Sequence, residues 1–168
     1  CSHKLSECFC TYDDLESHGI KNLVKLFRYS KTDESMPSNY LIYSLKQDNR
    51  KDVISFLADE MSGAIARQIG NNPSAYVLTS VPRRKRAIVE FGYDHAGTLA
   101  KEVSKRIGVE YVEILKSKST EPQKSVYGEA RRENAKFDYK CRVDLTLKGK
   151  TVILVDDIIT TGSSMINS

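Results

Sequence analysis

The fold is decided by the stretch Thr151-Val152-Ile153-Leu154-Val155-Asp156-Asp157-Ile158-Ile159-Thr160-Thr161-Gly162-Ser163-Ser164. Its first five residues are all β-branched or leucine, and such a run predicts a buried strand at 151–155. Two carboxylates follow the strand, and a turn rich in hydroxyl groups around a glycine follows the carboxylates. A buried strand that leads through such a turn into a new helix is typical of a parallel sheet covered by helices.

The turn after this strand carries the groups that a phosphorylated sugar requires. Hydroxyls, a glycine and the backbone N–H groups of a helix N-terminus would surround one phosphate at 160–164. Asp156 and Asp157 would accept hydrogen bonds from vicinal sugar hydroxyls, so we predict that they are the central, catalytic residues of the site. The substrate-binding residues predicted beside them are Ile158, Ile159, Thr160, Thr161, Gly162, Ser163 and Ser164. Taken piece by piece, the stretch also fits a strand that ends at an Asp-rich turn, with Thr160 or Thr161 as an ordinary helix N-cap.

The chain before this stretch alternates between helix and strand patterns, as an α/β sheet requires. Apolar residues recur at three- and four-residue steps after Asp52, which predicts a long helix with Asp52 as its N-cap and an end at Gly70. A second amphipathic helix is predicted at 93–106, and Gly108 lies where a C-terminal glycine belongs. The other predicted elements are strands at 21–29, 75–81, 109–115 and 140–143 and a helix at 40–45 capped by Asn39.

The composition is that of an ordinary globular protein, with 168 residues, 40% hydrophobic and 29% charged residues, and a net charge of +4. A charge of this size permits contact with phosphates or nucleic acid without requiring it. The chain has no apolar run of about eighteen residues and no secretory signal pattern, so we expect no membrane partner and a cytoplasmic location. Its first residue is not methionine, which leads us to expect a longer protein.

Three of the four cysteines, Cys1, Cys8 and Cys10, lie at the N-terminus together with His3. These residues are of the types that bind zinc, but their single-residue spacings strain tetrahedral chelation. We therefore expect reduced cysteines without a tightly bound zinc ion.

The stretch 152–164 resembles the phosphoribosyl pyrophosphate signature of type I phosphoribosyltransferases. A second motif is similar to a segment of the competence protein F family, whose phosphoribosyltransferase-like members are linked to DNA uptake. Val81-Pro82, followed by the hexapeptide at 91–96, looks like that family's Val-Pro…Arg-Gly-Phe-Asn-Gln-Ala segment. In this chain phenylalanine replaces the arginine, and Asp94-His95 replaces Asn-Gln.

The resemblance extends into the segment between these two motifs. Gln123, Arg131 and Asn134 match the Gln…Arg-x-x-Asn loop of the same family. Together the motifs cover roughly 77–164, and their joint spacing is more specific than any one of them. Earlier in the chain, Leu45-Lys46 echoes a Leu-Lys-Tyr stretch of the family.

This resemblance implies an α/β fold of the parallel-sheet, type I phosphoribosyltransferase-like kind. It implies a phosphoribosyltransferase-like domain at 39–168 and, before it, a small cysteine-containing N-terminal segment at 1–38 that would be the remnant of a zinc ribbon. The family's fold continues through the helix that begins at the glycine-containing turn and through at least one more strand. We therefore expect the domain to be incomplete at its C-terminus.

The resemblance also implies a ligand, phosphoribosyl pyrophosphate, bound with Mg²⁺ that is held mainly by substrate oxygens. Transfer of phosphoribose to a nitrogen acceptor is the enzymatic activity that it suggests. A hood at 116–134 would close over the ligand through Gln123, Arg131 and Asn134. The pyrophosphate loop would consist of Pro82, Arg83, Arg84, Lys85 and Arg86. A solvated basic turn is the simpler interpretation of these four cations.

Two other functions remain open at this point. A competence protein of this fold could bind single-stranded DNA through its basic loops, without catalysis. A regulator could keep the fold and the ligand site but lack the reaction. A second copy of the chain, in a homodimer, is a further partner that the sequence allows.

Overall fold

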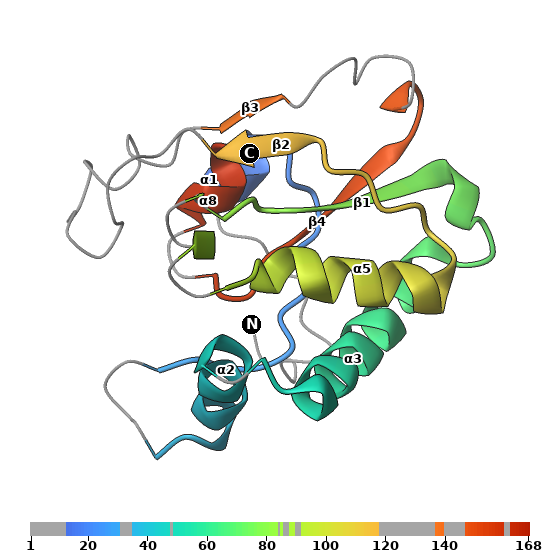
Figure 1. Ribbon diagram of the computed structural model, residues 1–168. Coiled ribbons are helices and arrows are strands. Elements are labelled where there is room, and N and C mark those ends of the chain that lie inside the picture. The colour runs from blue at the N-terminus through green and yellow to red at the C-terminus, as the bar shows by residue number, and fades with distance from the viewer. Residues whose placement is uncertain are drawn as a thin grey trace.

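The computed structural model describes residues 13–30, 35–47, 49–83, 85, 88–89, 92–117, 137–139, 147–159 and 162–168. The elements are α1 (Asp13–Ser17), α2 (Pro37–Gln47), α3 (Lys51–Ile69), η2 (Pro73–Ala75), β1 (Tyr76–Ser80), α5 (His95–Ile107), β2 (Leu115–Ser117), β3 (Phe137–Tyr139), β4 (Thr151–Val155) and α8 (Ser163–Ile166). Figure 1 shows β1 and β4 side by side, with α5 packed against them and α3 packed against α5. This order of layers confirms the predicted α/β class.

The sheet is built on the parallel pairing of β1 with β4. The two strands are in direct register, so that Ser80 lies opposite Val155, and the N–H of Val81 donates to the Val155 carbonyl at 2.9 Å. On its other side β1 meets the segment around Tyr111, which forms a parallel bridge with Leu78. β1 therefore has neighbours on both sides, and its residues 77–80 are buried.

The core lies where α5 packs between the sheet and α3. The buried side chains of α5 include Ala96, Leu99, Ala100 and Val103, the face that the sequence predicts. Full burial of one leucine of this kind stabilises a fold by about 1.5–3 kcal/mol. At the C-terminus of α5, Gly108 adopts a left-handed backbone with φ of 69° and ends the helix, as expected.

The predicted strand at 21–29 and the predicted cap at Asn39 are both wrong. The backbone at 21–29 is irregular, and none of the described strands pairs with it. α2 begins at Pro37, because proline fits the first turn of a helix. Asn39 is instead buried inside the helix, where its amide group donates to the Ser30 carbonyl at 2.7 Å and accepts from the Ser30 N–H at 3.3 Å. These two bonds attach the irregular segment to α2.

The long helix α3 is confirmed, but its predicted cap is wrong. Its N-cap is Arg50, which has an extended backbone and no side-chain capping bond, and Asp52 lies in the first turn. There the carboxylate is favoured by the helix dipole and forms an ion pair with the Arg50 guanidinium at 2.5 Å. The helix ends at Ile69, with Gly70 after it, as predicted.

The predicted strand at 109–115 is largely wrong. Within it only Tyr111 forms a bridge to β1, and a regular strand, β2, starts at Leu115. β2 pairs antiparallel with β3, so that Leu115 lies opposite Tyr139. The first two residues of the predicted hood, at 116 and 117, therefore belong to a short ribbon instead of a loop. The strand predicted at 140–143 lies outside the described residues, and β3 ends just before it.

None of the helices among the described residues combines the length and the apolar character that crossing a membrane requires.

Replacement of Asn39 by alanine should destabilise the protein, because it removes both hydrogen bonds to Ser30 from a buried position. We expect the free energy of unfolding to fall by about 1–3 kcal/mol, measured by urea denaturation followed by circular dichroism. Asn71→Ala, at an exposed position after α3, is the control and should change stability by less than about 0.5 kcal/mol. Equal effects of the two substitutions would contradict the role of Asn39 as the attachment of the N-terminal segment.

Candidate functional site

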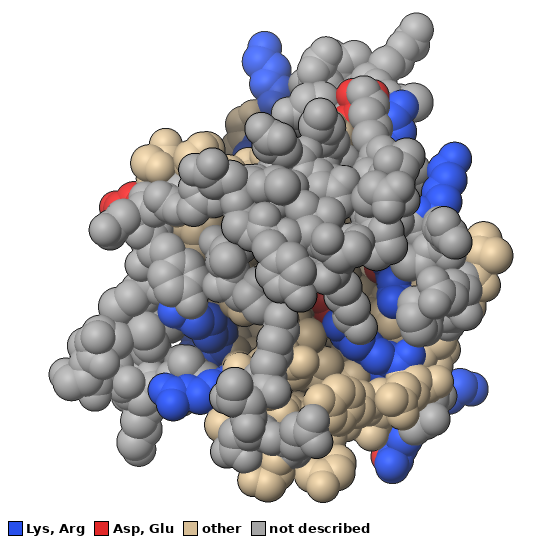
Figure 2. Space-filling view, turned by 90° about the vertical axis from the view of Figure 1, so that its left-hand side faces the viewer, with Lys and Arg blue, Asp and Glu red and all other residues tan. Residues whose placement is uncertain are grey.

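The two predicted ligand loops begin next to each other at the carboxyl edge of the sheet. Asp156 follows β4 directly, and Pro82 comes two residues after the end of β1. Because the strands are parallel and in register, the loops that leave them emerge at one edge, which is where open α/β sheets bind ligands. Figure 2 shows the molecule from this side, with lysine and arginine side chains at several places on the surface and acidic side chains visible between them.

The carboxylate pair is half-buried and electrostatically asymmetric. The Asp157 N–H donates to Oδ1 of Asp156 at 2.8 Å, and Nζ of Lys46 lies 2.9 Å from Oδ2 of Asp157. Burial raises the pKa of Asp156 well above its ordinary value, and the neighbouring charge of Asp157 raises it further. Burial alone would also raise the pKa of Asp157, but the Lys46 ammonium outweighs burial and lowers it. The pair thus offers one carboxylate that accepts hydrogen bonds and one carboxyl that tends to keep its proton and can donate.

Lys46 is a site residue that the sequence interpretation missed. It lies at the end of α2, far from the carboxylates in the sequence, and is brought to them by its neighbour Leu45. The Leu45 side chain is fully buried, and its carbonyl accepts a hydrogen bond from the Tyr93 hydroxyl at 2.9 Å. The weak Leu45-Lys46 echo of the family's Leu-Lys-Tyr stretch was the signal that could have identified it.

Arg83, predicted in the pyrophosphate loop, contacts the start of α5. Its Nη1 donates to Nδ1 of His95 in a short hydrogen bond and to the Tyr93 carbonyl at 3.3 Å. The Tyr93 and His95 rings pack edge to face, with centroids 4.5 Å apart. Burial and the positive charge of Arg83 lower the pKa of His95 to about 4, so the imidazole is neutral near pH 7. His95 is 2% exposed, as a structural histidine requires.

The other cations of this loop are only partly placed. Pro82 is half-buried at the end of β1, and Lys85 is exposed. Arg84 and Arg86 lie outside the described residues. Within the described part of the loop, Arg83 is therefore the cation that contacts the rest of the site.

The glycine of the phosphate turn is in close contact with the N-terminal helix α1. Gly162 has a left-handed backbone with φ of 75° and is the N-cap of α8, which has four residues. A Cβ at this position would lie 2.8 Å from Cδ2 of Leu15, a fully buried side chain of α1. The alternative with Thr160 or Thr161 as the N-cap is therefore wrong, because Gly162 takes that position.

The structure describes only some of the remaining predicted substrate-binding residues. Ile158, Ile159 and Ser164 are partly exposed beyond β4, and Ser163 is buried. Thr160 and Thr161 lie outside the described residues. The same holds for the predicted hood residues Gln123, Arg131 and Asn134 and for the N-terminal residues Cys1, His3, Cys8 and Cys10.

Comparison with known families gives a match over the C-terminal part of the chain. Residues 94–168, which include α5, β4 and the carboxylate loop, match the family model of the phosphoribosyl transferase domain. With the parallel pairing of β1 and β4, this match confirms a phosphoribosyltransferase-like fold.

The curated relatives point to a particular group within this class. The chain is 26% identical over 137 residues to the DNA utilization protein YhgH of Escherichia coli O157:H7, which covers 79% of this chain and 60% of that protein. It is 25% identical over 140 residues to YhgH of Salmonella typhi, which covers 81% of this chain and 61% of the relative. The chain thus spans about three fifths of the length of these relatives, and no solved structure matches it. These findings support the resemblance to the competence protein F family and to type I phosphoribosyltransferases.

The low pKa of His95 predicts a pH dependence of stability. Its pKa is about 4 in the folded protein and 6.5 ordinarily, so the unfolded chain takes up a proton between these values. The stability that neutral His95 supplies is fully present above pH 6.5 and is lost as the pH falls toward 4. We expect wild type to lose unfolding free energy faster than His95→Gln from pH 7 to pH 5, by up to about 1.4 kcal/mol per pH unit. Urea denaturation at pH 7, 6 and 5 measures this difference.

Glutamine is the matched replacement because the related segment of competence protein F has glutamine there, and its amide oxygen can still accept a hydrogen bond from Arg83. His18→Gln, at an exposed position after α1, is the control and should leave the pH profile unchanged. Parallel profiles for wild type and His95→Gln would show that His95 titrates normally and that the buried contact with Arg83 is absent in solution.

Proposed function

We propose that the protein binds phosphoribosyl pyrophosphate with Mg²⁺ at the loop that begins with Asp156. The observation that carries the proposal is the asymmetric carboxylate pair at the carboxyl edge of the sheet. A ribose presents two vicinal hydroxyls, each of which can both donate and accept a hydrogen bond. Asp157, whose pKa is lowered, accepts hydrogen bonds, and Asp156, whose raised pKa makes it keep a proton more readily, can also donate, so the pair matches the hydroxyls in both directions.

The charge around the pair suits a ligand that is itself strongly negative. Lys46 neutralises Asp157, so the pair does not present two uncompensated charges to an incoming phosphate. About a third of the Lys46 side chain is exposed, which leaves its ammonium accessible from the ligand side. Arg83 lies at the adjacent loop and adds a second positive charge to this end of the molecule. Such convergent cations favour an anionic ligand.

The described residues fit a metal that arrives with its substrate. None of their His, Cys, Asp and Glu side chains form a group of three or more that could hold a metal ion. Mg²⁺ commonly retains water and substrate oxygens, so the ion would be held mainly by phosphoribosyl pyrophosphate and water, while Asp156 and Asp157 hold the ribose hydroxyls. When bound, the ion would neutralise charge on the pyrophosphate.

The reaction that fits this ligand is displacement at C1 of the ribose. The bond from C1 to the pyrophosphate oxygen breaks, and pyrophosphate leaves with the electron pair. A nitrogen acceptor forms the new bond to C1 and then releases a proton. Asp156 and Asp157 would hold the ribose hydroxyls, so their contribution is to position the sugar and stabilise the positive charge that develops at C1.

A second candidate function is suggested by the relatives, which are named DNA utilization proteins. In that case the phosphate-binding edge would accept the backbone of single-stranded DNA, and basic side chains would follow the strand. The two functions make different demands on the carboxylates. A ribose with free hydroxyls requires Asp156 and Asp157, whereas a DNA backbone has no vicinal hydroxyls for them to bind.

The combined substitution of Asp156→Asn and Asp157→Asn should abolish binding of phosphoribosyl pyrophosphate, because amides cannot replace the charged acceptor. Isothermal titration calorimetry in the presence of Mg²⁺ measures the effect, and we expect at least a hundredfold loss of affinity. Circular dichroism must show that the variant is folded. Asp52→Asn, at an exposed position in α3, is the control and should bind like wild type. If the folded double variant and wild type bind phosphoribosyl pyrophosphate with equal affinity, the assignment of Asp156 and Asp157 to the binding site is wrong.

Limited proteolysis should distinguish the sugar phosphate from DNA. Trypsin can cleave the predicted hood after Lys118, Lys124, Arg131 and Arg132. We expect phosphoribosyl pyrophosphate with Mg²⁺ to slow cleavage there, and Arg131→Ala to weaken the protection, because the family resemblance assigns this arginine to the ligand.

A single-stranded oligo(dT) of twenty nucleotides is the competing ligand in the same assay, and we expect it to give no protection. Protection by oligo(dT) alone, with affinity that falls steeply as salt increases, would instead support the DNA function, because each neutralised phosphate releases counterions.

A further inference from the structure

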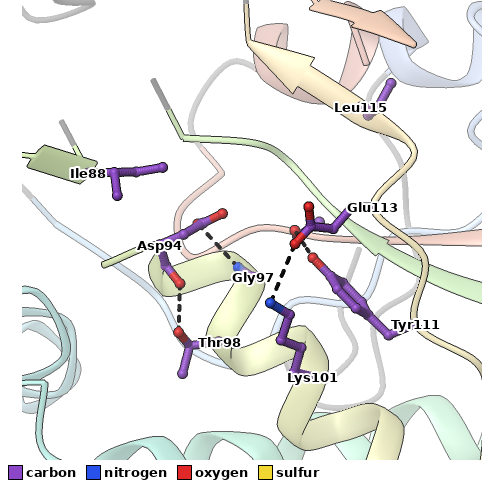
Figure 3. A pocket seen from close by; sticks show the side chains of 9 residues that line it. Ile88, Asp94, Gly97, Thr98, Lys101, Tyr111, Glu113 and Leu115 are labelled. Carbon is purple, nitrogen blue, oxygen red and sulfur yellow. Dashed lines mark hydrogen bonds and ion pairs between the residues drawn. The ribbon is translucent and has the colours of Figure 1, made fainter. Parts of the chain in front are cut away.

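A hollow lies at the carboxyl end of β1, on the side away from β4. It is a cavity of about 260 Å³ between the N-terminal half of α5 and the segment that precedes β2, and Figure 3 shows its lining. Ile88 and Leu115 supply apolar wall. The polar side chains that line it are Ser80, Asp94, Thr98, Lys101, Tyr111 and Glu113.

The polar side chains that line the cavity come from β1, α5 and the segment that precedes β2, and they contact one another. Nζ of Lys101 in α5 lies 3.4 Å from Oε1 of Glu113, and the same ammonium lies 5.4 Å from the centre of the Tyr111 ring. The Tyr111 hydroxyl is 3.1 Å from the Ser80 hydroxyl. Figure 3 shows Lys101, Tyr111 and Glu113 directed toward one another across the opening. The arrangement exposes hydroxyl and carboxylate oxygens to whatever enters the cavity.

The charge of the lining is net negative. Two carboxylates, Asp94 and Glu113, face one ammonium, Lys101. Burial raises the pKa of Asp94 in spite of the hydrogen bond from the Gly97 N–H and the charge of Arg83, and the charges of Asp157 and Glu113 add to the rise. A phosphate or carboxylate would therefore be repelled here. An amine, or a ring with several N–H donors, would gain hydrogen bonds to oxygens that already converge. An amine that binds as its cation would have to release a proton before its nitrogen could form the bond to C1.

The cavity adjoins the carboxylate pair of the proposed ribose site. Ser80 lines the cavity and lies opposite Val155, the residue before Asp156. Adjacent strands are separated by about 4.8 Å, so the two sites are separated by little more than one strand. The volume is below the usual 300–1,000 Å³ of sites for drug-sized ligands, and it therefore suits a molecule of about one ring.

We propose that this cavity is the acceptor subsite and that it takes a small, single-ring molecule with an amine or several N–H donors. The inference rests on the proposed function, because an acceptor requires phosphoribosyl pyrophosphate beside it. It goes further in naming the chemical class of the acceptor and the residues that select it. Glu113 and Tyr111 are the selecting groups, and Ser80 lies between the two sites.

Benzylamine and benzoate are suitable probes, since they have the same ring and opposite charges. Titration of ¹⁵N-labelled protein, followed by NMR, should show benzylamine shifting the amide signals of Thr98 and Glu113, with little effect of benzoate at the same concentration. Glu113→Gln should weaken benzylamine binding at least fivefold. The matched control is Glu110→Gln, three residues earlier, whose carboxylate is paired with Lys150 and does not line the cavity.

Tyr111→Phe is a second variant that keeps the ring and removes only the hydroxyl, so it should fold and should also weaken benzylamine binding. Equal binding of benzoate and benzylamine, or equal effects of Glu113→Gln and Glu110→Gln, would overturn the assignment of the cavity.

Calorimetry separates this inference from the proposed function. Phosphoribosyl pyrophosphate with Mg²⁺ should bind Glu113→Gln as it binds wild type, and should bind wild type while benzylamine saturates the cavity. Mutual exclusion of the two ligands would refute an acceptor subsite. Failure of wild type to bind phosphoribosyl pyrophosphate at all would refute the proposed function and the acceptor role with it. Normal binding of phosphoribosyl pyrophosphate without selectivity for benzylamine would refute the cavity assignment alone.

Discussion

The parallel pairing of β1 with β4 is the constraint on which the rest of the structure depends. The two strands are far apart in the sequence, yet their register brings Ser80 opposite Val155 and so makes two loops leave the sheet at one edge. A slip of one residue would turn the side chains of β4 to the other face, because neighbouring side chains alternate along a strand. The side chains of Asp156 and Asp157 would then exchange faces, and Ser80 would no longer separate the carboxylate pair from the cavity. The packing of α5 on the pair holds this register in place.

Two opposing effects, burial and neighbouring charge, decide which of the titratable groups of the site are charged. Burial favours the neutral form of both aspartates, and one ammonium decides which of them stays charged. Lys46 therefore does more than form an ion pair, because it makes two identical side chains chemically different. Arg83 acts in the same way on His95, whose neutral form accepts the guanidinium N–H. Both cations come from elements outside the carboxylate loop, so the electrostatics of the site belong to the tertiary structure.

Sequence patterns predicted correctly those features of the fold that depend on neighbouring residues alone. The strand at 151–155, the buried face of α5 and the end of that helix at Gly108 all follow from side-chain periodicity or from the backbone freedom of glycine. The failures have a common cause. The segment at 21–29 alternates like a strand but has no strand beside it among the described residues, and Asn39 is used for a contact with Ser30 instead of a cap. Lys46, and the pairing of Tyr111 with Ser80, depend on contacts between distant segments that no local pattern contains.

The packing of Leu15 against Gly162 has a consequence for the order in which the molecule assembles. The contact joins positions near the two ends of the described chain, and contacts of such long range are slow to form because a large loop must close first. α1 can pack this closely on the turn because position 162 has no side chain. The turn at this edge of the sheet is therefore completed by two segments that are far apart in the sequence, α1 and α8. A ligand bound at the turn would depend on contact between these two segments as well as on the sheet.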